Sequence, residues 1–127
     1  MRSVLDTSVL VGRPPTPIEG ELAISSASLA ELHVGVLVAR TESVRAERLR
    51  RLATIEARFD PIPVDDDVAR AYGHLAARTV SAGRQPRARV MDLLIAATAM
   101  AHAARVVTRN PGDLAGLDDL IEIVPIS

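Results

Sequence analysis

The feature that most constrains this chain is an alternation of short apolar runs with longer helix-like stretches. The first run, Ser3 to Val11, is apolar and β-branched nearly throughout, which predicts a strand that is covered on both faces and ends at Gly12. A second short run is Leu22 to Ser25, and the runs Arg105 to Thr108 and Ile121 to Val124 have the character of buried strands. The order strand, helices, strand, helices, strand predicts an α/β sandwich with a mostly parallel central sheet.

The stretches between these runs have the features of helices. The predicted helices are Ser28 to about Arg40, Thr41 to Phe59, Val68 to near Gly83, and Met91 to Ala104. The second is amphipathic, and its side rich in Arg and Glu is interpreted as a solvated face. The acids Asp65, Asp66 and Asp67 precede the third helix. Carboxylates stabilise a helix N-terminus, so these acids are interpreted as caps rather than as metal ligands.

Proline-containing or polar segments connect these elements. Pro14, Pro15 and Pro17 predict an irregular loop after the first strand. The prolines within Asp60–Val64 predict a short extended segment at a sheet edge or at a strand start. The polar segment Arg84–Arg89 is predicted to be a loop.

The size and composition of the chain limit its organisation and its partners. With 127 residues, of which 48% are hydrophobic, the chain can bury one sizeable core, and we expect a single domain over residues 1–127. One Tyr, one Phe and no Trp leave no aromatic platform for stacking bases. The net charge of −1 excludes binding to nucleic acid by bulk positive charge, so any such contact must be local.

The absence of cysteine and of a long apolar segment excludes further classes. Without cysteine there is no disulfide framework, no thiolate zinc site and no cysteine nucleophile. The apolar stretch Leu93–Ala101 is far too short to span a membrane. These features predict a soluble, cytoplasmic protein.

Asp6 is the most conspicuous polar residue of the chain, because it interrupts the most apolar of the predicted strands. An unpaired carboxylate buried there would cost about 2–7 kcal/mol or more. A metal ion is one way to compensate it. The alternative is a local Asx-type turn with Thr7 and Ser8.

Three further acids follow or precede predicted strands and helices. Glu31 completes a Ser-x-x-Glu pattern with Ser28 and is either a capping-box acid or a functional one. Asp92 opens an apolar helix, where it is either an N-cap or a ligand. Asp113 either caps a short turn or points to the same sheet edge. Each residue alone leaves both interpretations open.

The four acids together favour a metal centre. In parallel α/β sheets, ligand sites form beyond the carboxyl ends of the strands, so we expect these acids to converge there. Converging carboxylates repel each other unless a cation is present. Oxygen donors without cysteine select a hard ion, Mg²⁺ or Mn²⁺. Such a centre hydrolyses phosphodiesters by activating water and neutralising charge in the transition state.

Four segments resemble, in order, the motifs of PIN-domain nucleases. They are Val4–Ser8, Ser25–Gly35, Asp92–Ala99 and Val107–Asp113. The resemblance covers nearly the whole chain and is to the VapC-type toxins of toxin–antitoxin pairs. One departure is Leu114, where these toxins commonly carry Phe, and Leu can fill the same core position. The resemblance implies a PIN-like three-layer α/β/α sandwich.

The resemblance also implies roles for individual residues and an activity. Asp6 and Asp92 are implied as the principal metal ligands, with Glu31 and Asp113 completing the acidic centre. The polar residues implied to orient ligands or water are Thr7, Thr108 and Asn110. The implied activity is that of a Mg²⁺- or Mn²⁺-dependent endoribonuclease toxin that acts on RNA, is inhibited by a VapB-type antitoxin and forms a homodimer.

Loop arginines are the candidates for contact with the substrate. Arg13, Arg87 and Arg89, together with Arg84, lie in predicted loops, where they either bind phosphates or are merely solvated. Two other functions stay open: a stand-alone RNA-processing PIN nuclease, and a non-catalytic metal-binding α/β interaction module. A receiver-like module is disfavoured because the chain has no lysine.

Overall fold

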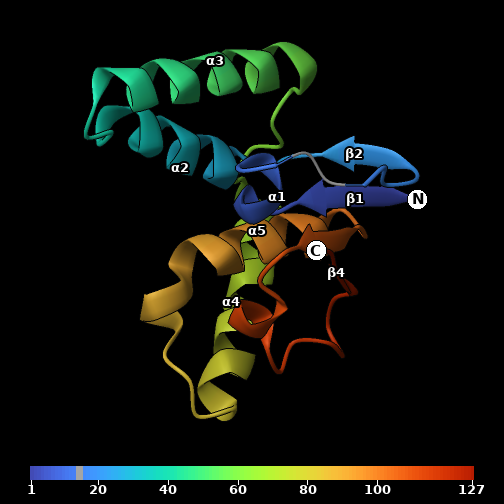
Figure 1. The fold of residues 1–127 in the computed structure, drawn as a ribbon. Helices are drawn as coiled ribbons and strands as arrows, with labels where there is room; N and C mark the ends of the chain where they lie inside the picture. The colour runs from blue at the N-terminus through green and yellow to red at the C-terminus, as the bar shows by residue number, and fades with distance from the viewer. Residues whose placement is uncertain (14–15) are drawn as a thin grey trace.

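A computed structural model describes residues 1–13 and 16–127. In these residues four strands form one sheet in the order β2-β1-β3-β4, and all neighbouring strands are parallel (Figure 1). The strands are β1 (Arg2–Leu5), β2 (Glu21–Ala23), β3 (Arg105–Thr108) and β4 (Ile123–Pro125). Their carboxyl ends therefore lie at one edge of the sheet, as the strand–helix alternation predicts.

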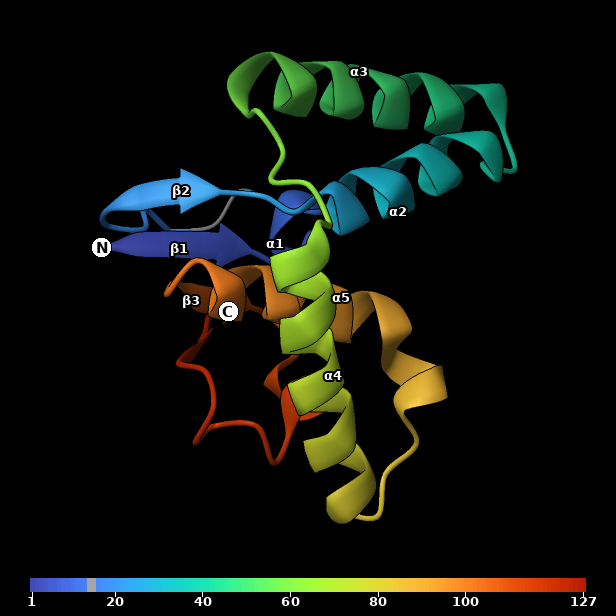
Figure 2. The same cartoon turned by 180° about the vertical axis from the view of Figure 1, so that it is seen from behind.

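Helices connect the strands and cover both faces of the sheet. They are α1 (Thr7–Leu10), α2 (Ser26–Leu37), α3 (Glu42–Arg58), α4 (Asp66–Ser81) and α5 (Val90–Ala101), with short 3₁₀ helices η1 (Pro86–Arg89) and η2 (Pro111–Leu114). Figures 1 and 2 show α2 and α3 side by side on one side of the sheet, and α4 and α5 on the other. This arrangement is a three-layer α/β/α sandwich.

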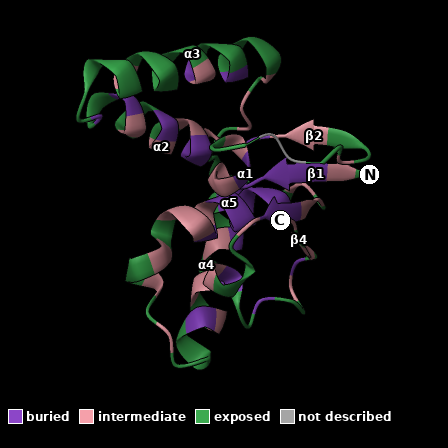
Figure 3. Cartoon of the chain, viewed as in Figure 1, coloured by how far each residue is buried: buried purple, intermediate pink, exposed green. Residues whose placement is uncertain are grey.

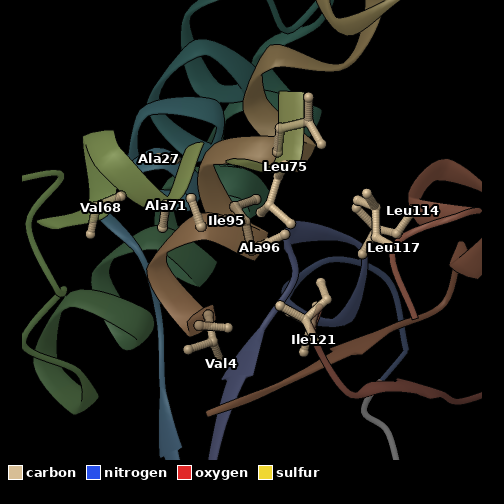
Figure 4. Packing of buried hydrophobic residues seen from close by; sticks show 14 residues of the cluster. Val4, Ala27, Val68, Ala71, Leu75, Ile95, Ala96, Leu114, Leu117 and Ile121 are labelled. Atoms are coloured by element: carbon tan, nitrogen blue, oxygen red, sulfur yellow. The ribbon is translucent and has the colours of Figure 1, made fainter. Parts of the chain in front are cut away.

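Two hydrophobic clusters hold the layers together, because successive strand residues point to opposite faces. Val4 and Val106 pack with residues of α4 and α5 in the first cluster, part of which Figure 4 shows. Leu5 and Val107 pack with residues of α1, α2 and α3 in the second. The expectation that the first strand is covered on both faces is therefore confirmed. Both clusters are largely aliphatic, as the composition requires.

The outer surface of α3 is exposed along most of its length (Figure 3). Only Leu52 and Ile55 of this helix are buried. Thr41 caps its N-terminus by accepting a hydrogen bond from the Val44 amide. The predicted bounds of this amphipathic helix are therefore confirmed to within one residue at each end, and so is its largely solvated charged side. Asp65 likewise caps α4, as predicted for the acid run.

Several predicted boundaries are wrong for local reasons. β1 ends at Leu5 rather than at Val11, because Asp6 caps a new helix that begins at Thr7. Helix α2 begins at Ser26, two residues earlier than predicted, and its N-cap is Ser25 and not Ser28. Asp60–Val64 forms no full strand, but Ile62 makes an isolated parallel bridge to Ser25 just beyond the edge strand β2, so the predicted extended segment at the sheet edge is found only at this residue.

The remaining predictions concern the connecting loops and the last strand. Residues 86–89 of the predicted loop Arg84–Arg89 form η1, and the strand predicted at Ile121–Val124 is β4, shifted by one or two residues. Pro14 and Pro15 of the predicted proline-rich loop lie outside the described residues. No helix in the described ranges combines the length and apolarity needed to cross a membrane.

A candidate acidic active site at the carboxyl edge of the sheet

Asp6 occupies the first position after β1 and is almost completely buried, with 8% of its surface exposed. Its Oδ1 accepts a hydrogen bond from the Thr7 amide at 2.8 Å. Its Oδ2 accepts hydroxyl hydrogen bonds from Ser8 at 2.8 Å and from Thr108 at 2.7 Å. The contacts with Thr7 and Ser8 are those of the Asx-type alternative. The third donor comes from the end of β3, so the carboxylate is held where two central strands end.

Glu31 lies in the middle of α2 and faces the same edge. Its Oε1 accepts a hydrogen bond from the Thr7 hydroxyl at 2.6 Å, and the Ser28 hydroxyl lies 3.1 Å from the same Thr7 oxygen. The capping-box interpretation of Glu31 is wrong, because α2 is capped by Ser25, whose Oγ accepts from the Ala27 amide. Thr7, predicted to orient a ligand, links Glu31 to the start of α1.

Asp92 is the third residue of α5, and the N-cap position belongs to Arg89. The N-cap interpretation of Asp92 is therefore wrong. Desolvation and the neighbouring charges of Asp6, Asp113 and Glu31 raise the pKa of Asp92 from 3.8 to about 6, against a smaller lowering effect of Arg89. Since like charges raise a carboxyl pKa only at short range, the fold brings the four predicted acids into one electrostatic cluster.

Asp113 belongs to η2, and its side chain does not cap that helix. Its Oδ1 instead accepts a hydrogen bond from Arg89 Nη1 at 3.0 Å, and Arg89 also reaches the Asp113 carbonyl at 3.3 Å. The turn-cap alternative for Asp113 is therefore wrong. Arg89, predicted to bind substrate, is in this conformation paired with an acid of the cluster.

The other two residues predicted to support the site, Thr108 and Asn110, differ in how closely they contact the acids. Thr108 is buried and accepts a hydrogen bond from the Asn110 amide while it donates to Asp6. Asn110 contributes this backbone contact, and no side-chain hydrogen bond of Asn110 is found among the described residues. Thr108 is thus in direct contact with the acidic cluster, whereas the Asn110 side chain is exposed beside it.

Two residues of the site were missed by sequence reasoning. Ser8 donates to Asp6 and accepts from the Arg109 amide at 3.0 Å. The Arg109 guanidinium donates to the carbonyls of Ser8 at 3.0 Å and Arg13 at 2.8 Å, and also contacts the carbonyl of Ser127. The Asp-Thr-Ser sequence at positions 6–8 was the available signal for Ser8. No local pattern indicated Arg109.

The remaining predicted arginines lie apart from the acids. Arg13 is exposed after α1 and lines a cavity of about 530 Å³ against α3. Arg87 is exposed in η1, with no ion pair among the described residues. Arg84 donates to the carbonyls of Gly112 and Ala115, which fixes η2 to the loop before η1.

The candidate ligands of this site are all carboxylate or hydroxyl oxygens, which are the ligands that a hard cation such as Mg²⁺ prefers. Burial and the charges of neighbouring acids raise the pKa of Asp92, and a bound cation would relieve the repulsion between these charges. Across residues 1–13 and 16–127, however, no three His, Asp or Glu side chains stand close enough to hold one ion. The carboxylates of Asp6 and Glu31 are turned toward their hydroxyl donors in this conformation.

A parallel sheet with an acidic cluster beyond its carboxyl edge defines a class of α/β protein, and comparisons with known proteins place the chain within it. A family model for the PIN domain matches residues 3–119. The chain is 40% identical to Ribonuclease VapC5 of Mycobacterium tuberculosis, over 97% of this chain and 94% of that protein. It is 32% identical to Ribonuclease VapC4 of the same organism, over 98% and 97% of the two chains.

Solved structures give the same result. The crystal structure of VapBC-5 of M. tuberculosis, a member of the VapBC family of toxin–antitoxin systems, matches with a TM-score of 0.88 and 39% identity, covering 98% of both chains. FitAcB from Neisseria gonorrhoeae matches with a TM-score of 0.77 and 26% identity, covering 96% of both chains. The chain belongs to the PIN-domain family. The predicted family and its three-layer fold are confirmed.

Proposed function

We propose that this protein is a Mg²⁺- or Mn²⁺-dependent endoribonuclease and the toxin of a VapBC-type toxin–antitoxin pair. The observation that carries the proposal is the electrostatic cluster around Asp92, whose pKa is raised to about 6 by burial and by three other acids. Retaining four mutually repelling carboxylates is costly for a fold unless they bind a cation. The similarity to named VapC ribonucleases over nearly the whole chain supports RNA as the substrate.

In this proposal the four acids have different roles in binding the metal ion. Asp6 and Asp92 would hold the metal ion, and Glu31 and Asp113 would complete its surroundings directly or through water. When bound, the ion would supply a water of lowered pKa and positive charge beside the scissile phosphate. The Thr7 hydroxyl, 2.6 Å from Glu31, would fix the orientation of that carboxylate. Thr108 and Ser8 would do the same for Asp6.

The three predicted substrate-binding arginines would have two different functions. Arg87, exposed and unpaired among the described residues, would contact the RNA backbone. Arg89 would hold Asp113 and limit repulsion within the cluster, as its lowering effect on the pKa of Asp92 suggests. Arg13 would contact RNA from the loop after α1, on the side of the site nearest α3.

Residues 1–127 would act as one PIN domain in the cytoplasm, as a homodimer held inactive by a small VapB-type antitoxin. The name of the VapBC-5 structure, a complex of a toxin–antitoxin family, supports this partner. A stand-alone RNA-processing enzyme would need no such partner. Co-purification of the chain with the product of an adjacent short reading frame would therefore separate the two functions.

The direct experiment is RNA cleavage by the purified protein. Total bacterial RNA incubated with the protein and Mg²⁺ or Mn²⁺ should yield new 5′ ends at defined positions, as read by 5′-end sequencing. Asp6→Asn removes one charge of the cluster but keeps a side chain of the same shape, and should abolish these ends while the protein stays folded. Equal cleavage by the parent and by Asp6→Asn would reject the proposed centre.

A further inference from the structure

A cavity of about 330 Å³ lies beside the acidic cluster, between α2 and α3. Its walls combine residues of the cluster with residues of both helices: Thr7, Glu31, Leu32, Gly35, Arg48 and Arg51. Figures 1 and 2 show α2 and α3 running side by side over this region. Thr7 and Glu31 belong to both the cluster and the cavity wall, so the cavity adjoins the acids directly.

The positive charge of this cavity comes from two arginines of α3. Arg48 Nη1 donates to the Gly35 carbonyl at 2.6 Å, which holds the guanidinium across the gap between the helices and leaves its other N–H groups for a ligand. Arg51 is half-buried and has no ion pair or hydrogen bond among the described residues. It also lines the 530 Å³ cavity that contains Arg13. Arg51 departs from the general solvation of the charged side of α3, whereas Arg48 is exposed at the rim of the cavity.

Gly35 is the third feature of the cavity. It lies inside α2, where glycine is less favourable than alanine. A Cβ atom added at Gly35 would meet no atom within 4 Å. The protein's own packing therefore does not require glycine at this position. Its effect is to leave one wall of the cavity without a side chain.

We infer that this cavity is a subsite for a backbone phosphate of single-stranded RNA, next to the phosphate that is cleaved. The inference rests on the proposed nuclease function. An RNA strand with its scissile phosphate at Asp6 and Asp92 carries its neighbouring phosphates one nucleotide to either side. Arg48 and Arg51 present planar guanidinium groups suited to phosphate oxygens, and the missing side chain of Gly35 leaves room for the strand.

RNA is favoured over an acidic protein segment by the position of Glu31. Glu31 repels any anion in this cavity, a peptide carboxylate as well as a phosphate. An RNA strand differs because its cleaved phosphate would be held by the cation at the acids, and the strand would then bring its next phosphate into the cavity. The subsite also supplies local positive charge to a chain whose net charge is −1. An acidic peptide is the competing occupant, and RNA affinities that do not depend on the arginines would favour it.

The binding test uses a fluorescein-labelled single-stranded RNA of mixed sequence in EDTA, so that no cleavage occurs. Arg51→Gln removes a cavity charge, and Arg50→Gln is the matched control because Arg50 is exposed on the same helix and lines neither cavity. Loss of one charged phosphate contact should weaken binding about tenfold or more. It should also reduce the slope of log Kd against log salt by about 0.7, the value for one phosphate on a single strand. Arg50→Gln should change neither strongly.

The steric test uses Gly35→Leu. Leucine is a better helix former than glycine, and no side chain or other element lies within 4 Å of an added Cβ. The variant should therefore unfold at the same temperature as the parent or a higher one. The cavity, however, would be partly filled, so RNA affinity should fall and KM for RNA cleavage should rise, with kcat less affected. A purely structural role for Gly35 predicts no such separation of stability from affinity.

The outcomes separate this inference from the proposed function. If the parent cleaves RNA but Arg51→Gln and Gly35→Leu bind RNA like Arg50→Gln, the subsite is rejected and the nuclease stands. If the parent cleaves no RNA with either metal but RNA affinity still depends on Arg51 and Gly35, the nuclease is rejected and the nucleic-acid subsite stands.

Discussion

At the scale of single residues, the site depends on hydroxyl groups as much as on acids. Asp6 is buried in the cluster with three hydrogen-bond donors, of which Thr108 comes from a different strand. Charge-assisted hydrogen bonds of this kind offset much of the cost of burying a carboxylate. Asp92 differs, because no hydrogen bond to its side chain is found among the described residues while burial and neighbouring acids raise its pKa. Asp92 is therefore the acid that gains most from a cation.

Glu31→Gln tests whether the charge at this position is needed. The amide oxygen of Gln can still accept the Thr7 hydroxyl, so the free energy of unfolding should change by no more than about 1 kcal/mol. RNA cleavage in saturating Mg²⁺ should fall by orders of magnitude, because the negative charge that holds the ion or orients its water is lost. Thermal unfolding and cleavage rates, measured on the same preparation, check both parts. Cleavage at close to the parental rate would remove Glu31 from the catalytic centre.

Asp92→Asn tests the repulsion within the cluster. Because the pKa of Asp92 is raised from 3.8 to about 6, the folded protein binds this proton more tightly than the unfolded chain does. The stability contributed by protonated Asp92 is therefore full below about pH 3.8 and is lost as the pH rises to about 6. Asn stays neutral, so the metal-free variant should be more stable than the parent near neutral pH, by about 1 kcal/mol after allowance for solvent screening.

Urea unfolding in EDTA on either side of this pH range is the measurement. The two proteins should converge in stability toward the acid end and separate toward neutral pH. A constant difference at all pH values would show that the substitution acts through packing and not through charge.

At the scale of elements, the sequence predicted the class and order of the helices and strands but not how the first strand ends. An apolar run from Ser3 to Val11 has the composition of one strand, yet its second half is α1. The deciding interaction is the cap that Asp6 forms with Thr7 through Oδ1, while Thr108, 102 residues away in sequence, donates to Oδ2 and holds the carboxylate in place. Local propensity contains no information on such a contact.

The same limit explains which parts of the site were predictable. The four acids could be found because carboxylates near predicted strand ends are conspicuous. The purely structural alternatives depended on the positions of the helix caps. Because the N-cap of α2 is Ser25 and not Ser28, Glu31 has no capping role. Arg89 and Asp113 are 24 residues apart, so their pairing could not be read from either local pattern.

Gly20→Ala tests the turn that brings the chain into β2. Gly20 has φ +93°, and an added Cβ would lie 2.3 Å from the Met1 carbonyl oxygen, which accepts the Glu21 amide hydrogen bond. Gly12, with φ +78° and no atom within 4 Å of an added Cβ, is the matched control. Both alanine variants should lose about 1–2 kcal/mol from backbone strain. Gly20→Ala should lose more, because β2 must shift away from β1.

Denaturant midpoints of the two variants provide the comparison. Equal destabilisation by Gly20→Ala and Gly12→Ala would mean that only backbone conformation matters. It would contradict the close approach of Met1 to this turn.

At the scale of the whole molecule, the two cores fix the elements that carry the four acids. The carboxylates come from the end of β1, from α2, from α5 and from η2, and these elements are held by packing on both faces of the sheet. Folding therefore imposes the repulsion, and an ion that binds only the folded state should return stability to the entire domain. This links metal binding to unfolding without reference to catalysis.

Mg²⁺ or Mn²⁺ should raise the unfolding temperature of the parent with a dependence on concentration that follows a single binding curve. At a free ion concentration about one hundred times Kd, the expected gain is about 2.7 kcal/mol. Asp92→Asn should lose most of this gain, whereas Asp118→Asn, at an exposed acid of the loop after η2, should retain it. NaCl of equal ionic strength controls for screening of surface charge. If NaCl reproduces the stabilisation, or if Asp92→Asn is stabilised as much as the parent, the cluster does not bind the ion, and any metal requirement of RNA cleavage must arise from the RNA.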